Sequence, residues 1–124
     1  MCDMPKPPEV GSVGKDGSVR IGCPWDHAAA WARIRSDGGI ELELYDHSPS
    51  AEQHFGNDVA WLYRVPDAEI PRLTRALEAR IGQRITDREK ILQTFATHFD
   101  HVHAIRDWLK ASGIPYEEHF DSWA

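Results

Sequence analysis

The fold is decided by the stretch AWARIRSDGGIELELY, residues 30–45. In both halves of this stretch, small or aliphatic residues alternate with aromatic or charged ones, and a Ser-Asp-Gly-Gly sequence at 36–39 separates the halves. Alternation with a period of two on either side of such a turn is typical of a β-hairpin. One face of the hairpin is then apolar and the other charge-paired. A three-residue loop over 37–39 predicts the cross-strand pairs Ile34–Leu42, Arg33–Glu43, Arg35–Glu41 and Trp31–Tyr45.

Two other segments have the composition of strands. Alternating apolar residues at 19–23 precede Pro24, which predicts a short first strand, because proline cannot donate to a sheet ladder. Residues 59–65 are apolar on both faces, as in a central strand, and end at Pro66. Together with the hairpin, these segments predict three or four strands before the helices.

Residues 67–112 contain three runs with apolar residues at helical spacing. Whether the second and third runs, within 87–112, form two helices or one bent helix stays open. The helix-end signals are an N-cap at Asp67, a closing Gly82, a capping box at Thr86 and Glu89, a cap at Asp100 and a closing Gly113.

Together these elements predict a single α+β domain over residues 18–124. We expect an antiparallel sheet of three to five strands, followed by two or three C-terminal helices packed on one face. Residues 114–124 return as an edge strand or lie across the sheet. Residues 1–17 contain three prolines and three glycines with few apolar positions, so we expect a flexible N-terminal arm.

The acidity of the chain is concentrated in two places. The formal net charge is −6, and residues 37–58 carry six acids without a Lys or Arg, while residues 114–124 add three acids and no base. Localised charge of one sign indicates a partner of the opposite sign. Binding to nucleic acid needs clustered Lys and Arg, so we expect no nucleic-acid partner. A basic protein partner is favoured instead.

Hydrophobicity and cysteine content indicate the cellular compartment of the protein. No apolar run approaches the roughly 20 residues of a membrane span, so we expect no membrane insertion. The chain has two cysteines and no signal-peptide pattern, which favours the cytoplasm.

We therefore expect a non-enzymatic, acidic protein-binding module with no catalytic residue and no cofactor. Acids would steer association with the basic partner, and aromatic residues would supply the desolvated contacts. The predicted partner-binding residues are Asp46, Glu52, Asp58, Trp31, Tyr45, Glu117, Glu118, Asp121 and Trp123.

The alternative is a small metal-binding protein or metal-dependent enzyme that uses the histidines around Asp100. His98, His101 and His103 form a His-x-x-His-x-His run with this aspartate. On a continuous helix His98 and His101 share a face while His103 points elsewhere, so only a helix break would bring all three to one ion. We interpret the run as a wet, partly capping helix junction, with no metal site.

Other chemical-looking motifs have simpler interpretations. Cys23 and His27 lie four residues apart, but catalytic Cys and His residues normally meet from distant segments. The Asp-His-Ser sequence at 46–48 lacks a nucleophile-elbow pattern and indicates a turn. The acids of residues 46–58 do not match the spacing of a calcium loop.

The order of the elements resembles small bacterial α+β domains of the immunity-protein kind. The resemblance spans residues 18–124 and includes the Phe-Gly-Asn-Asp turn at 55–58, the helix start at 66–67 and the ending at 108–123. Proteins of this kind neutralise a cognate toxin, and many are acidic because their toxins are basic nucleases. The resemblance thus implies a basic protein partner and identifies no individual contact residue.

Overall fold

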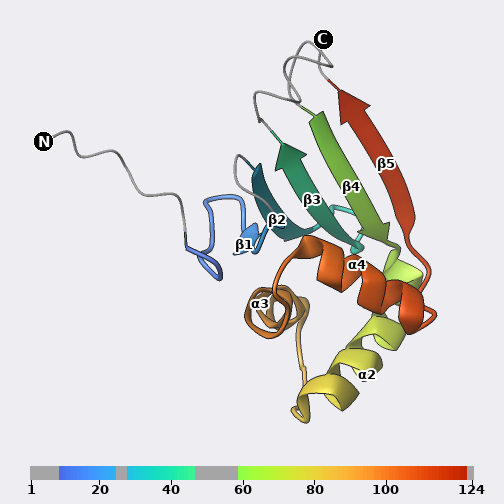
Figure 1. Cartoon of the computed structure of the whole chain (residues 1–124). Helices are drawn as coiled ribbons and strands as arrows, with labels where there is room; N and C mark the ends of the chain where they lie inside the picture. Colours follow the sequence, from blue (N-terminus) through green and yellow to red (C-terminus); the bar gives the residue numbers. More distant parts are fainter. Residues whose placement is uncertain (1–8, 25–27, 47–58, 123–124) are drawn as a thin grey trace, which may run out of the picture.

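The computed structural model describes residues 9–24, 28–46 and 59–122, the side chains of 121 and 122 excepted. It contains a five-stranded antiparallel sheet whose strands lie side by side in chain order (Figure 1). The predicted α+β class is confirmed. The strands are β1 (Val19–Ile21), β2 (Ala28–Ile34), β3 (Ile40–Asp46), β4 (Val59–Val65) and β5 (Glu117–Ser122).

Between β4 and β5 the chain forms the helical layer, which lies on one face of the sheet (Figure 1). The open question about residues 87–112 is settled, because two separate helices form there. The helical elements are the 3-10 turn η1 (Asp67–Glu69) and the helices α2 (Ile70–Ile81), α3 (Arg88–His98) and α4 (Val102–Ala111).

The core lies between the sheet and this layer. On β3, Ile40, Leu42 and Leu44 have no exposed surface, because their side chains alternate onto the helix-facing side. Leu73 of α2 and Leu109 of α4 are equally buried from the opposite side. Each such side chain contributes roughly 1.5–3 kcal/mol of burial free energy, so this layer contact holds the fold together.

The hairpin forms as predicted, but the predicted register is wrong by two residues. Ile34 pairs with Ile40, and Arg33 pairs with Glu41. The loop begins one residue earlier than expected, at 36–38, because Gly38 takes the left-handed conformation (φ 93°) at its third position. The amide of Gly38 donates to the carbonyl of Arg35 at 3.0 Å, which closes the turn. Since a two-residue shift preserves the alternation, the two faces are those that the sequence predicted.

The three predicted N-caps are wrong by small displacements. Asp67 does not cap; its carboxylate pairs with Arg88 at 2.6 Å. Asp87 caps α3 in place of Thr86, accepting from the amide of Lys90 at 2.8 Å. The Nδ1 atom of His101 caps α4 in place of Asp100, accepting from the amide of Ala104 at 3.2 Å. In contrast, Gly82 ends α2 in the left-handed conformation (φ 68°), as expected.

The two edges of the sheet are built differently. At the β1 edge, residues 11–14 run along the strand: the amide of Gly11 donates to the carbonyl of Arg20 at 2.7 Å, and the amide of Arg20 donates to Ser12 at 2.9 Å. Gln93 of α3 fixes this segment through a 3.0 Å bond to the carbonyl of Gly11. At the other edge, β5 pairs with β4 over six residues, so the C-terminal segment returns as an edge strand. The boundary between a flexible arm and the domain at residue 17 stays a prediction.

Candidate protein-binding face

The face of the sheet that points away from the helices carries most of the described polar groups of the strands. Strand alternation places these side chains there, since their neighbours in sequence point into the core. The central residues of this outer face are Trp31 and Arg33 on β2, Glu41, Glu43 and Tyr45 on β3, and Arg64 on β4.

Four of these side chains form an ion-pair network across three strands. Arg33 donates to Glu41 at 2.8 Å and to Glu43 at 2.6 Å, and Arg64 donates to the other oxygen of Glu41 at 2.7 Å. Burial by itself would raise the pKa of Glu41, but the hydrogen bonds and charges of Arg64 and Arg33 outweigh burial and lower it. Burial likewise opposes the charge of Arg33, yet Glu43 and Glu41 raise the pKa of this guanidinium. Both shifts favour the charged forms of Glu41 and Arg33, and the network contains two acids and two bases, so its formal charges balance.

A hollow of about 340 Å³ opens beside this network. Trp31 and Tyr45, both partly exposed, line it together with Arg33 and Glu43, and the turn at 14–18 forms its far wall. Aromatic side chains that stand beside fixed charges at a surface are typical of the anchor points of protein interfaces. This hollow is the strongest candidate for a recognition site on the outer face.

The turn at 14–18 contributes the groups of the hollow that sequence reasoning missed. Asp16 accepts hydrogen bonds from the backbone amide of Ser18 at 3.0 Å and from its hydroxyl at 2.9 Å, and these bonds lower the pKa of the carboxyl. The hydroxyl of Ser18 also accepts from Arg33 at 3.3 Å. The guanidinium of Arg20 lies 5.2 Å from the ring centre of Trp31. The Asp-Gly-Ser sequence at 16–18 is an Asx-turn signal that indicates an ordered turn within the predicted arm.

A second hollow of about 270 Å³ lies on the same face, near the β2–β3 turn. Arg35, Asp37 and Arg64 line it together with Glu117 and His119 of β5. The pairing of the strands sets Glu41, Arg64 and Glu117 in one row across β3, β4 and β5. The two acidic segments of the sequence therefore meet in part on the outer face.

The other predicted partner-binding residues are dispersed. Asp46 has only 9% of its surface exposed, so it is buried and not presented to solvent as the sequence interpretation required. Glu118 is exposed but pairs with Tyr63 on the opposite face of the sheet from Glu117. In β5, the backbone of Asp121 pairs with that of Ala60 of β4. Outside the described residues are Glu52, Asp58 and Trp123.

Two of the three histidines around Asp100 take part in capping or ring packing. His98 is exposed at the end of α3, and His101 uses its Nδ1 atom to cap α4. The ring of His103 stands 6.5 Å from that of Tyr63, and burial followed by the charge of Arg106 lowers its pKa. Within the described residues, no group of three His, Cys, Asp or Glu side chains is arranged to hold a metal ion.

The other candidate motifs are placed as follows. The thiol of Cys23 donates to the carbonyl of Ala28 at 3.2 Å. Its sequence neighbour His27, and residues 47–48 of the Asp-His-Ser motif, lie outside the described residues. Glu43, Arg33 and the other described groups of the outer face thus remain the candidates with a defined geometry.

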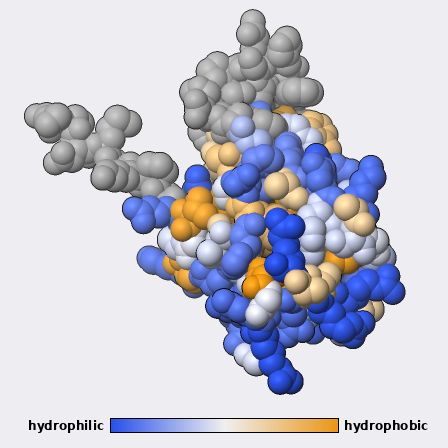
Figure 2. All heavy atoms as spheres, turned by 60° about the horizontal axis from the view of Figure 1, so that its bottom comes forward, coloured by the Kyte–Doolittle hydropathy of each residue, from blue (hydrophilic) through white to orange (hydrophobic). Residues whose placement is uncertain are grey.

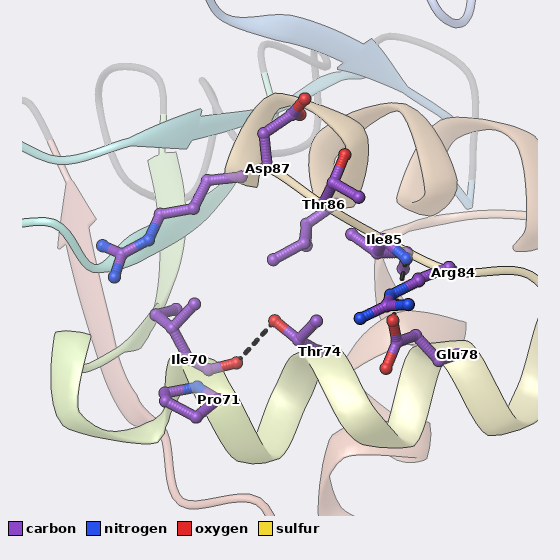
Figure 3. Close-up of a pocket in the computed structure, with 10 residues that line it drawn as sticks. Ile70, Pro71, Thr74, Glu78, Arg84, Ile85, Thr86 and Asp87 are labelled. Atoms are coloured by element: carbon purple, nitrogen blue, oxygen red, sulfur yellow. Dashed lines mark hydrogen bonds between the residues drawn. The ribbon is translucent and has the colours of Figure 1, made fainter.

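A further hollow, of about 420 Å³, lies between α2 and the start of α3 (Figure 3). Its polar groups hold the local structure together: the amide of Ile85 donates to Glu78 at 2.8 Å, and the hydroxyl of Thr74 donates to the carbonyl of Ile70 at 2.8 Å. The Thr74 hydroxyl is thereby engaged within its own helix. We assign this hollow to the α2–α3 connection and give it no functional role.

Compared with known proteins, the sequence matches no protein-family model, and no curated protein or solved structure is significantly similar to it. In the described part of the chain, none of the helices has the length and apolar character needed to cross a membrane. The geometry of the outer face is therefore the main indication of function.

Proposed function

We propose that this chain is a non-enzymatic, acidic protein-binding module of the immunity or inhibitor kind, which docks a basic protein with the outer face of its sheet. The observation that carries the proposal is the hollow between Trp31 and Tyr45, set beside an ion-pair network on a sheet face opposite the helices. The resemblance of residues 18–124 to immunity proteins agrees with this assignment.

Charge distribution supports a basic partner. Residues 67–112, which form the helical layer, contain eight bases and seven acids, whereas the rest of the chain contains six bases and thirteen acids. The excess negative charge therefore belongs to the segments outside the helical layer. Negative charge in these segments would accelerate association with a positively charged protein and discriminate against acidic ones.

The fixed geometry of the outer face supports recognition. The carboxylates of Glu41 and Glu43 are held by Arg33, and Asp16 is held by Ser18, so these groups are ordered before a partner arrives. Preorganised side chains lose little conformational freedom on binding, which favours affinity. The helix side, in contrast, is largely hydrophilic with small scattered apolar patches (Figure 2).

The test is capture of a partner from the source cells with immobilised wild-type protein and two variants, at low and moderate salt. The site variant carries Trp31→Ala and Tyr45→Ala, and the control carries Tyr116→Ala, which removes a partly buried tyrosine packed against Tyr63. We expect one basic protein at near-unit stoichiometry with wild type and control, released by salt, and a loss of roughly tenfold or more in affinity with the site variant.

Circular dichroism and urea unfolding must first show that both variants remain folded. A captured protein that binds the site variant and wild type equally well would refute the outer face as the docking surface. A captured protein with net negative charge would refute the electrostatic part of the proposal.

A further inference from the structure

Among the described residues, β5 is an edge strand of the sheet. All six residues of the strand pair with β4 on one side, from Glu117 with Arg64 to Ser122 with Val59. Within the described residues, no strand pairs with its other side. In an antiparallel sheet, alternate residues of an edge strand direct their N–H and C=O groups outward, where a further strand can bind them.

The charge of β5 selects the strand that can pair there. The sequence Glu-Glu-His-Phe-Asp-Ser carries three acids and no Lys or Arg. Antiparallel pairing of all six residues with β5 of a second copy would set Glu118 opposite Asp121 twice. Like charges directly opposite one another destabilise strand pairing, so a second copy is disfavoured and a cationic strand is favoured.

Phe120 adds an apolar requirement. Its surface is 48% exposed, and its ring lies 5.3 Å from that of Trp61 on the neighbouring strand. An apolar side chain placed across from Phe120 would extend this aromatic contact onto the added strand. The edge therefore combines backbone hydrogen bonding, negative charge and one apolar contact.

We propose that the free edge of β5 binds an extended cationic segment of a partner protein as a sixth strand of the sheet. Basic side chains of that segment lie across from Glu117 and Glu118, and an apolar one lies across from Phe120. The inference rests on the proposed function, since it states how a basic partner attaches. Main-chain bonds supply the affinity and the alternating side chains the specificity, as in other strand-addition complexes.

The test uses two synthetic peptides of eight residues with capped ends. The first has two adjacent lysines, a phenylalanine two residues before them, and threonine and valine elsewhere, so that it can set lysines across from Glu117 and Glu118 and the phenylalanine across from Phe120; the second has the same sequence with four consecutive central backbone nitrogens methylated. Methylation keeps the charge but removes the donors needed for strand pairing. Titration into isotopically labelled protein reports binding through amide chemical shifts, and hydrogen exchange reports protection of β5.

We expect the first peptide to shift and protect the amides of 117–122, and the methylated peptide to bind at least roughly tenfold more weakly, because several hydrogen bonds are lost. Equal binding of both peptides, or no binding by either, would overturn the proposal. Shifts confined to the hollow beside Trp31 would overturn it as well.

Two charge-matched variants complete the design. Glu117→Lys with Glu118→Lys changes the edge, whereas Glu89→Lys with Asp100→Lys makes the same change in charge at an exposed position of α3 and at an exposed position of the α3–α4 junction. Peptide binding is expected to be lost only in the first. If the peptide fails to bind while partner capture still depends on Trp31 and Tyr45, the edge inference fails and the proposed function stands. If the peptide protects β5 but partner capture is the same with and without the two aromatic side chains, the proposal that the partner docks on the outer face fails.

Discussion

The two edges of the sheet show two ways of finishing a sheet. β1 has three residues, and its outer side is closed by hydrogen bonds from residues 11–14 of the same chain. β5 has six residues, three of them acids. Among the described residues, no segment covers it as residues 11–14 cover β1. A closed edge is protected from every partner, while a charged edge is protected only from partners of the same sign. β5 is therefore the edge that can select a partner by its charge.

The ion-pair network of the outer face follows the same division. It begins at Ser18 beside β1, passes through Arg33 and Glu41, and ends at Arg64 of β4. Among the described residues, none of its ion pairs extends to β5; the carboxylate of Glu117 lies 3.7 Å from the Nε2 atom of His119 in the same strand. In the described part of the chain, these side-chain bonds thus tie β2, β3 and β4 to the turn before β1, while β5 is joined to β4 by backbone pairing.

The largest expected effect breaks the closed edge. Gly22 follows β1, and a Cβ atom added there would lie 2.2 Å from the carbonyl oxygen of Asp100. Gly22→Ala therefore forces β1 away from the α3–α4 junction, and we expect a loss of about 3 kcal/mol in the free energy of unfolding, measured with urea. Gly14→Ala is the control, because a Cβ atom added there would lie 3.2 Å from a side-chain oxygen of Asp16. This variant should lose far less free energy of unfolding. Equal losses would contradict the tight packing of β1.

A second prediction concerns the network that stops at β4. Glu41→Gln removes the charge that joins Arg33 and Arg64, and we expect a loss of about 1–2 kcal/mol in stability near neutral pH. Because the pKa of Glu41 is lowered in the folded protein, its contribution is present above the ordinary glutamate pKa and is lost as pH falls through the lowered value.

Urea unfolding at about pH 7 and about pH 4 checks this sign. When the pH is lowered from the first value to the second, the free energy of unfolding should fall less in the variant than in the wild-type protein. An identical pH dependence in both proteins would show that Glu41 does not hold the network.

A third prediction, with a smaller effect, concerns the bond that fixes the segment along β1. Gln93→Ala removes the 3.0 Å bond to the carbonyl of Gly11, so we expect a loss of about 0.5–1 kcal/mol. Amide exchange of residues 11–20 should accelerate, while that of β5 stays unchanged. Gln83→Ala, at an exposed position after α2, is the control with no expected effect. Faster exchange at both edges would mean that the closed edge is not held locally.

The smallest effect needs no substitution. The amide of Arg20 donates to Ser12 at 2.9 Å, so hydrogen exchange should find it protected. The outward amides of β5 should exchange faster in the wild-type protein. Protection of every β5 amide would show that its edge is already covered.

The fold was predictable because its patterns are local. Alternation at 30–45 and 59–65 and helical spacing from Ile70 onward each report which side of an element is buried. The hairpin register was not predictable from the pattern alone, since Gly38 and Gly39 could each supply the left-handed residue and a two-residue shift leaves the faces unchanged. The helix caps failed for a similar reason: several polar residues near each start compete, and tertiary contacts decide among them, as Arg88 does for Asp67.

The candidate site was predictable in part. Trp31 and Tyr45 were assigned to the outer face from alternation alone, and both line the main hollow. The burial of Asp46 was missed because the negative charge of a segment does not show which carboxylates point outward. Asp16 and Ser18 were missed because glycines in the first seventeen residues hid an ordered turn.

The neighbours β4 and β5 are separated in sequence by residues 66–116, whereas β1 to β4 are joined in chain order. Contacts between distant segments form late in folding, because a long loop must close first. We therefore expect the first four strands and the helices to assemble before β5 docks, with β4 as a temporary edge. In that interval β5 of one molecule can dock on β4 of another, so crowded synthesis of this chain would yield strand-exchanged dimers.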